Sequence, residues 1–230
     1  MARSNIAGSG SNRFNSAVGT VPATAVSLTM ACWFKLIDAT DTSQTLISLR
    51  LNTEVDNHRF TLSALLTRQF LATTRVTTDG IASTVNLITS GAWSHGVGVF
   101  NSDRNRRAIL NGDWANSNSD ITELIPIGVN QIQIGIRGTS TFPLRGEIAE
   151  VAVWIVALTQ AEVELLATGA SPRRVQIANL AFYAPLRGGD SSGNELDVIG
   201  GTLMTEDGTM GMTNHPPKVI LKSGVLLYEQ

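Results

Sequence analysis

Residues 144–154, LRGEIAEVAVW, and residues 158–169, LTQAEVELLATG, decide the fold of this chain. In the first segment, a turn glycine at Gly146 precedes a long apolar run that ends at Trp154. An apolar run that follows a turn residue is typical of a buried strand. The first segment therefore predicts a long buried strand.

The second segment predicts a single short helix. Thr159 and Glu162 have the capping-box spacing, in which the hydroxyl and the carboxylate bond two backbone N–H groups left open at the start of a helix. Gly169 suits the left-handed residue that closes a helix. We therefore expect one helix near residues 159–168, directly after the buried strand.

Apolar and polar residues alternate in several other segments, which is the pattern of a strand with one buried face. Turn signals such as Asn111-Gly112 separate these segments. Many short strands at this spacing predict an all-β sandwich or barrel. The expected core positions of three of these strands are Leu28, Met30, Cys32, Phe34, Leu36, Phe60, Leu62, Ala64, Ile132, Ile134 and Ile136.

Three further segments add motifs to the opening stretch. They read SLTMACWFK at residues 27–35, AWSHGVGVF at 92–100 and RRAILNG at 106–112. They resemble the F-T-I-S-A-W-F-K, W-x-H-V-A/G-x-x-F and R-x-x-Y-V-N-G motifs of laminin-G-like domains, whose last strand and helix read G-x-I-D-E-V-x-I-W/Y…A-L-S/T-x-x-E-I. The resemblance spans about residues 12–170 and implies an antiparallel β-sandwich, a concanavalin-like jelly roll.

The end of the chain carries a second resemblance. Residues 180–217 are similar to the y-W-P-L…D-x-S-G-N…T-G…H-P-P tail of jelly-roll proteins in phage genomes. Residues 218–229 then read as a β-hairpin around Ser223-Gly224. Because an isolated hairpin is only marginally stable, we expect it to dock on the sandwich or on a neighbouring subunit. The expected organisation is an N-terminal arm at 1–13, a jelly-roll domain at 14–216 and a C-terminal hairpin extension at 217–230.

The composition indicates a globular protein without a nucleic-acid or membrane partner. The chain has 230 residues, a net charge of −2 and 43% hydrophobic residues, so it can bury a large core but has no electrostatic attraction to nucleic acid or anionic membranes. No membrane span and no secretory signal are visible. The one cysteine, Cys32, is expected in the core. A chain without signal or disulfide is what we expect of a phage virion protein, made in the host cytoplasm and released by lysis.

The motifs of hydrolytic enzymes are missing. A glycosidase needs two carboxylates at a defined separation, and the E-x-D-x-x-E run of the related glucanases does not occur. Glu147 and Glu150 are three residues apart, which on a flat strand places them on opposite faces. The histidines at 58, 95 and 215 lack metal-binding spacing, and we expect His95 to be hydrogen-bonded within the sandwich. The chain is therefore expected not to be an enzyme.

Calcium is the one ion that the resemblance suggests. Many laminin-G-like domains bind Ca²⁺ through the aspartate of G-x-I-D-E-V, but the equivalent residue here is Ala149, which offers no side-chain oxygen. This departure disfavours the usual calcium site, and no other cofactor is expected. A glycine-rich loop holds the weak candidate metal ligands Asp190, Ser192, Asn194 and Asp197. The alternative to metal binding in this loop is an Asx-turn, in which these side chains bond their own backbone.

Trp114 is the candidate for a glycan contact, with Asn116 beside it. Trp114 follows the Asn111-Gly112 turn and could offer a stacking surface, or it could pack against a neighbouring loop or subunit. The other tryptophans are expected in the core, because aromatic residues dominate sandwich interiors: Trp33, Trp93 and Trp154.

Two functions remain open. The first is a structural virion protein of a tailed phage, a capsid decoration or cement protein that contacts the major capsid protein, tail components or copies of itself. Its N-terminal arm and C-terminal hairpin would add strands to neighbours. The alternative is a carbohydrate-binding adhesin, such as a tail-fibre or lectin-like surface module, that recognises host glycans. The residues expected to form the assembly arm are Val219, Leu221, Val225, Leu227 and Tyr228.

Overall fold

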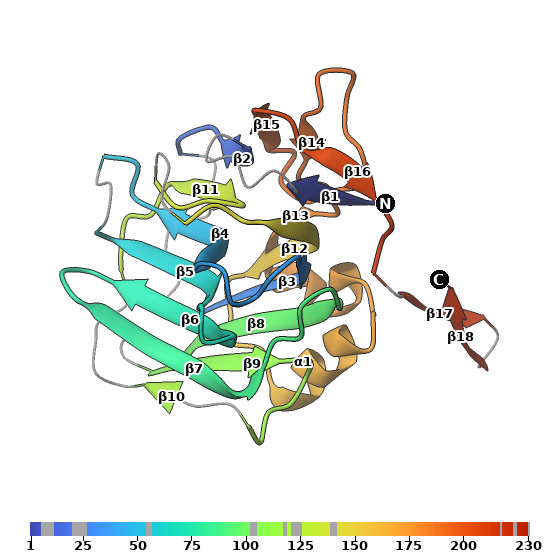
Figure 1. Cartoon of the computed structure of the whole chain (residues 1–230), viewed down its shortest axis with the longest axis horizontal. Helices are drawn as coiled ribbons and strands as arrows, with labels where there is room; N and C mark the ends of the chain where they lie inside the picture. Colours follow the sequence, from blue (N-terminus) through green and yellow to red (C-terminus); the bar gives the residue numbers. More distant parts are fainter. Residues whose placement is uncertain are drawn as a thin grey trace.

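The chain forms a two-sheet antiparallel β-sandwich with one short α-helix (Figure 1), which confirms the predicted fold class. Two eight-stranded sheets, sheet A and sheet B, pack face to face, and a two-stranded sheet stands beside them. No helix in the described part has the length and apolar character to cross a membrane. The computed structural model describes residues 1–5, 12–19, 27–53, 57–101, 105–116, 119–120, 126–138, 142–216, 218–222 and 225–229.

Sheet A has the strand order β10-β9-β8-β3-β12-β1-β16, and β13 also pairs with β12. Its strands are β1 (Ala2–Asn5), β3 (Leu28–Leu36), β8 (Ser94–Asn101), β9 (Asn105–Leu110), β10 (Ser119–Asp120), β12 (Gly146–Trp154), β13 (Leu180–Ala184) and β16 (Gly211–Thr213).

Sheet B has the strand order β14-β15-β2-β11-β4-β5-β6-β7. Its strands are β2 (Arg13–Ser16), β4 (Gln44–Arg50), β5 (Arg59–Ala64), β6 (Gln69–Arg75), β7 (Asp79–Leu87), β11 (Gln131–Ile134), β14 (Glu195–Leu196) and β15 (Leu203–Asp207).

The main core lies between the two sheets, where the alternation predicted it. All five positions expected in β3 belong to this core, as do the three expected in β5 and the two that lie in β11. Ile136 is also buried, but it lies beyond the end of β11. Two glycines of β8 allow the sheets to approach closely, because a Cβ at Gly96 or Gly98 would collide with a side chain of sheet B. Cys32 is buried there, and burial raises the pKa of its thiol.

A second apolar cluster covers the outer face of sheet A, where it packs beneath α1 (Gln160–Ala167) and the 3₁₀ helices η1 (Pro172–Arg174) and η2 (Ile177–Asn179). The predicted capping box is present: the Thr159 N–H donates to Glu162 Oε2 at 2.8 Å. Gly169 ends the helix with φ of +93°. The indole N–H of Trp154 donates to the Val175 carbonyl at 2.8 Å, which fixes this layer to the sheet.

Gly146 does not form the expected turn. It is the first residue of β12 and lies opposite Leu36 of β3. A Cβ at this position would collide with the carbonyl oxygen of Lys35. The glycine is therefore required by the close approach of two backbones.

The predicted separation of Glu147 and Glu150 on opposite faces is wrong. A β-bulge interrupts β12 between Ala149 and Ala152, and Glu150 has a left-handed backbone with φ of +53°. The extra residue turns Glu150 toward Tyr183 on the outer face of sheet A, where Glu147 pairs with a lysine. The flat-strand rule failed because a bulge shifts the alternation by one residue.

The beginning of the chain differs from the expected N-terminal arm. Strand β1 lies inside sheet A, between β12 and β16. The side chain of Arg3 is buried, and its Nε donates to Glu195 Oε1 at 2.6 Å. Because β13 pairs only with the second half of β12, the first half is open to β1. Residues 6–11 of the expected arm lie outside the described residues.

Two paired strands lie where the sequence predicted the C-terminal hairpin, while its expected turn, Ser223-Gly224, lies outside the described residues. Strands β17 (Lys218–Lys222) and β18 (Val225–Glu229) pair with each other and with no strand of sheets A and B in the described part of the chain. Figure 1 shows them outside the two large sheets. The side chains of the five expected assembly residues lie outside what the structure describes.

Candidate functional site

A hollow of about 320 Å³ lies on the outer face of sheet A, where β8 and β9 meet the segment that leads into α1. We call it the Trp114 hollow. It brings together the chain segments that carry one aromatic ring, one guanidinium group, two amides and one hydroxyl. Its lining residues are Val99, Asn101, Asn105, Arg107, Trp114, Ala157, Leu158 and Thr159.

A tight turn positions Trp114. Asn111 and Gly112 have φ values of +54° and +74°, and the Asp113 N–H donates to the Leu110 carbonyl at 3.1 Å. Left-handed residues at both central positions are typical of a type I′ turn, which the Asn-Gly pair favours. The turn directs Trp114 onto the second apolar cluster, where its side chain is partly buried. Packing within the chain was one of the two roles expected for this residue.

A single hydroxyl positions the opposite wall. Thr29 of β3 donates from Oγ1 to the Val156 carbonyl at 2.8 Å, and the same oxygen accepts from the Leu158 N–H at 3.0 Å. These bonds fix residues 156–158 on the outer face of sheet A. Thr159, the helix cap, therefore stands at the rim of the hollow.

The chemistry of the Trp114 hollow suits a ligand with both hydroxyl groups and apolar C–H surfaces. The Arg107 guanidinium carbon lies 4.9 Å from the centroid of the Trp114 ring, so a cation–π contact holds both side chains. Asn101 and Asn105 lie opposite each other at the ends of β8 and β9, and both are exposed. Each amide can donate and accept hydrogen bonds.

Asn116, the second expected glycan contact, does not line the Trp114 hollow. Its side chain donates to Asp113 Oδ2 at 2.7 Å, and its backbone N–H donates to Asp113 Oδ1 at 3.1 Å. The Asn86 amide donates to the same carboxylate. These bonds, chiefly the one from the Asn116 side chain, hold the pKa of Asp113 below its usual value. Asn116 therefore supports the turn that carries Trp114.

Sequence reasoning missed most of this hollow. Asn101 and Asn105 come together through the pairing of β8 with β9, and Thr159 through the return of the chain over sheet A. No local pattern marks them. Besides the turn before Trp114, a local signal was the pair Arg106-Arg107, but a cluster of charge is usually only a solvated surface.

Of the three tryptophans expected in the core, only Trp154 is fully buried. Trp33 and Trp93 are half-buried on the outer face of sheet A. Trp33 packs against His95, with ring centroids 5.1 Å apart, and Trp93 lies 5.7 Å from Lys35 Nζ. The prediction failed for these two because Trp33, in β3, and Trp93, just before β8, lie on the outer face, which the second cluster covers only in part.

His95 is buried but lacks the expected hydrogen bond. Its side chain is 3% exposed, and within the described part of the chain its Nδ1 has no hydrogen-bond partner. Burial lowers its pKa to about 3. His95 is therefore a neutral packing residue.

The loop with the weak metal candidates forms Asx-turns, the alternative that the sequence left open. Asp190 Oδ1 accepts from the backbone N–H groups of Ser192 and Asn194 at 2.9 and 3.0 Å. The Asn194 side chain donates to Asp190 Oδ2 and contributes most to lowering the pKa of Asp190. Asp197 is buried and accepts from three backbone N–H groups, one of them that of Tyr183 at 2.9 Å.

Metal-binding clusters are not found among the described residues: no three His, Cys, Asp or Glu side chains converge there. Ala149, at the position of the calcium-binding aspartate in the resemblance, is buried opposite Trp33.

Glu150 is the buried centre of a polar cluster. Its carboxylate accepts a hydrogen bond from the Tyr183 hydroxyl and pairs with Arg187 at 3.0 Å and with His215 Nε2 at 2.7 Å. Burial and the neighbouring carboxylate raise the pKa of Tyr183. The three partners come from β13, from the loop after it and from the segment before β17. The cluster therefore ties the C-terminal segment to the bulge of β12.

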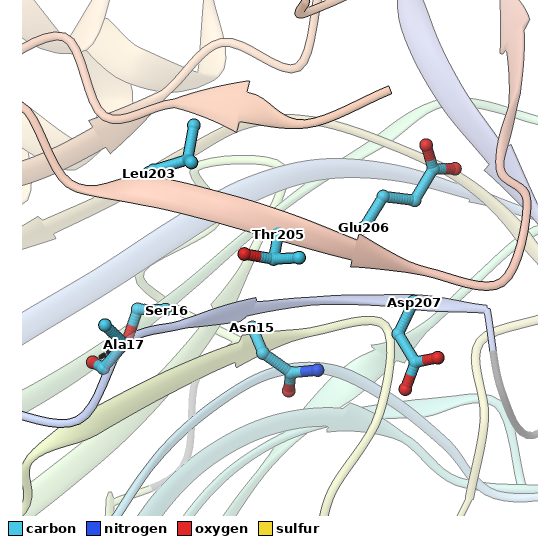
Figure 2. A pocket seen from close by; sticks show the side chains of 7 residues that line it. All are labelled: Asn15, Ser16, Ala17, Leu203, Thr205, Glu206 and Asp207. Carbon is cyan, nitrogen blue, oxygen red and sulfur yellow. Dashed lines mark hydrogen bonds between the residues drawn. The ribbon is translucent and has the colours of Figure 1, made fainter. Parts of the chain in front are cut away.

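A further hollow, of about 500 Å³, lies over β2 and β15 (Figure 2). Figure 2 shows Glu206 pointing away from Asn15 and Asp207. Two of the polar groups are engaged within the chain: Asn15 accepts from Gln133, and Asp207 pairs with Arg13 at 2.6 Å. No aromatic ring is among the described residues that line it. This hollow is therefore the weaker candidate for a site.

The comparison with family models finds one match, described as "Concanavalin A-like lectin/glucanases superfamily", over residues 8–164. No curated protein matches the sequence.

Solved structures similar to this chain share its fold at low sequence identity. The heptameric SAP-like pentraxin of Limulus polyphemus is 17% identical with a TM-score of 0.56, over 70% of this chain and 78% of that one. A putative carbohydrate binding protein of Bacteroides ovatus is 17% identical with a TM-score of 0.58, over 89% of this chain and 60% of that one. The CBM40 of Ruminococcus gnavus IT-sialidase, bound to α2,3-sialyllactose, is 15% identical with a TM-score of 0.52, over 61% and 82%.

Proposed function

The chain belongs to the concanavalin A-like lectin/glucanases superfamily, and on this premise we propose that it is a carbohydrate-binding protein that recognises glycans without changing them. The observation that carries the proposal is the Trp114 hollow, where an aromatic ring, a guanidinium group and two exposed amides converge. The names of similar structures support the proposal, since they include a putative carbohydrate binding protein and a module bound to sialyllactose.

Each group in the Trp114 hollow has a role in this proposal. The accessible part of the Trp114 ring packs against the C–H surface of a sugar, and Arg107 holds the ring in place while it donates to sugar oxygens. Asn101 and Asn105 exchange hydrogen bonds with vicinal hydroxyls. Binding requires no chemical step, and the proposed ligands are host-surface glycans.

A glycan array followed by calorimetry tests the proposal. The array includes α2,3-sialyllactose and arabinotriose, the ligands named for two similar structures. We expect saturable binding of at least one glycan and at least about a tenfold loss of affinity in Trp114→Ala, because an aromatic contact and its hydrogen-bonding neighbours contribute about 1–3 kcal/mol. Trp93→Ala is the matched control, since Trp93 is half-buried on the same face but does not line the hollow.

No saturable binding to any glycan would contradict the proposed function. Equal losses in Trp114→Ala and Trp93→Ala would contradict the site, because a shared loss points to a general change in the fold.

A structural role in a virion is the second candidate, and the hairpin is the observation that favours it. Strands β17 and β18 form a sheet of their own and pair with no described strand of the sandwich, so their edges are available to another chain. If the chain is a decoration or cement protein of a phage capsid or tail, removal of residues 217–230 should abolish its incorporation into particles. Normal decoration by the truncated protein would rule out this role for the hairpin.

A further inference from the structure

A hollow of about 150 Å³ lies on the outer face of sheet B, the face turned away from the core. Strands β4 to β7 form its floor, and the side chains of Arg137 and Phe142 form its wall. We call it the sheet B hollow. The Trp114 hollow lies on the outer face of sheet A, so the two hollows open on opposite sides of the sandwich.

Hydroxyl groups line the floor of the sheet B hollow. Thr45 and Ser63 lie opposite each other on β4 and β5, and both line the hollow together with Thr73 of β6. In the next cross-strand row, Ser48 and Thr61 lie beside Thr73 on the same face. They are 0% and 2% exposed, and their hydroxyl oxygens have no hydrogen-bond partner among the described residues.

Such a row of hydroxyls is costly for the fold alone. A buried hydroxyl without a partner destabilises a protein by about 1–3 kcal/mol, and valine fits the same place on a strand without this cost. Ser48 and Thr61 are sealed beside the hollow, so the hydroxyls within reach of a ligand are those that line it: Thr45, Ser63 and Thr73.

An exposed aromatic ring forms one wall. Phe142 is 41% exposed, and the Arg137 guanidinium carbon lies 4.9 Å from its ring centroid. Its backbone is left-handed, with φ of +53°, and its carbonyl accepts from the Thr45 N–H at 2.8 Å beside a bulge in β4. Strained backbone and bulges concentrate at binding sites, where they aim a side chain. Here they aim an apolar ring at the rim of the hollow.

A fixed carboxylate completes the site. Asp79, the first residue of β7, lines the hollow, and its two oxygens accept from Arg59 and Arg75, each at 3.0 Å. An ionised carboxylate has about four lone-pair positions, so it can accept further bonds from ligand hydroxyls. Asp79 and Arg137, the two charged residues that line the hollow, carry opposite charges, so the lining offers no net charge to an ionised ligand.

We infer that the sheet B hollow is a second saccharide subsite, which takes one neutral sugar unit; the inference rests on the proposed carbohydrate binding. The floor hydroxyls and Asp79 exchange hydrogen bonds with the sugar hydroxyls, and the Phe142 ring covers a C–H face. The volume of about 150 Å³ limits the site to a single ring. With one subsite on each side of the sandwich, a single molecule can join two glycan chains, and this raises avidity on a surface with many glycans.

Titration of the ¹⁵N-labelled full chain with neutral trisaccharides of glucose, galactose and mannose tests the inference. We expect two separable groups of shifting amide signals, one around Thr73 and one around Trp114. Thr73→Val, which removes one hydroxyl at nearly constant shape, should weaken only the first group by about three- to tenfold. Phe142→Asn should do the same, because asparagine tolerates the left-handed backbone. Thr205→Val, on the same sheet but outside the hollow, is the control.

The outcomes separate this inference from the proposed function. Binding at Trp114 alone, unaffected by Thr73→Val and Phe142→Asn, would overturn the second subsite and leave the function intact. Binding around Thr73 that survives Trp114→Ala supports the inference even if the Trp114 site fails. If the wild-type chain binds these sugars at neither place, the second subsite is overturned. The proposed function fails as well only if the glycan array and calorimetry also find no glycan that binds.

Discussion

Burial changes the ionisation of His95. The side chain lies on the outer face of sheet A, 3% exposed, with its ring against Trp33. Its pKa falls to about 3 because the charged form loses its solvation. At the scale of single residues, this histidine makes the fold sensitive to acid.

We expect the free energy of unfolding to fall as the pH drops from about 6.5 toward 3. In this window the unfolded chain binds a proton at His95 and the folded chain does not, so acid favours unfolding, by roughly 2–3 kcal/mol between pH 7.5 and 4.5. Urea unfolding at pH 7.5 and 4.5 measures the free energy of unfolding at each pH. The difference between the two values should be smaller in His95→Gln than in the wild-type chain. His58→Asn is the control and should keep the wild-type difference; an unchanged difference in His95→Gln contradicts the assignment.

Gly146 is a residue where any side chain is harmful. Gly146→Ala should lower the free energy of unfolding by about 1–3 kcal/mol, because the added Cβ collides with the backbone oxygen of Lys35, which cannot rotate away. Gly211→Ala is the control, because the nearest atom outside its chain neighbours would lie 3.9 Å from the added Cβ. We therefore expect the free energy of unfolding of this variant to change by no more than about 0.5 kcal/mol. Denaturant unfolding measures both, and equal stability of the two variants would show that β12 and β3 can move apart.

At the scale of elements, β12 organises sheet A. It pairs with β3 along one side and with β1 and β13 along the other. Its bulge places Glu150 among Tyr183, Arg187 and His215, so one carboxylate joins three segments that are far apart in sequence. This cluster fixes the chain just before the C-terminal hairpin.

Glu150→Ala should therefore destabilise the protein by about 1–3 kcal/mol, because it leaves the buried hydroxyl of Tyr183 without its acceptor and removes the contacts with His215 and the exposed Arg187. Glu147→Ala, on the same strand, removes a pair with Lys35 whose members are only partly buried, and should cost about 1 kcal/mol or less. Thermal and urea unfolding can rank the two variants. A larger loss in Glu147→Ala would show that the cluster does not stabilise the fold.

At the scale of the whole molecule, two parts of the chain have different roles. The first residues belong to the sandwich, since β1 pairs on both sides within sheet A. The last strands form a sheet of their own. The sandwich therefore depends on its beginning and not on its end.

Removal of residues 217–230 should change the unfolding midpoint by less than about 2 °C, because the hairpin pairs with no described strand of the sandwich. Removal of residues 1–5 should lower it by several times more, since the deletion takes away β1 and the buried Arg3–Glu195 pair. Calorimetry gives both midpoints. A large shift on removal of the hairpin would show that it docks on the sandwich.

Local patterns in the sequence determined the fold class. Alternation placed all of β3 and its core face, the capping box placed the start of α1, and Ser223-Gly224 placed the C-terminal hairpin. Each of these features depends on residues within a few positions of one another, so it can be read from a short segment. The same reasoning singled out Trp114, because its turn is local.

Only the tertiary structure decided where those elements expose a site. The Trp114 hollow needs the pairing of β8 with β9 and the return of residues 156–159 over sheet A, and the sheet B hollow needs four strands in register. The bulge that moves Glu150 lies in the pairing of β12 with β3, and β1 and β13 share the other edge of β12. The bonds of Thr29 to residues 156–158 and the pairings of β12 join residues far apart along the chain, and the gain from burying them together exists only in the folded sandwich.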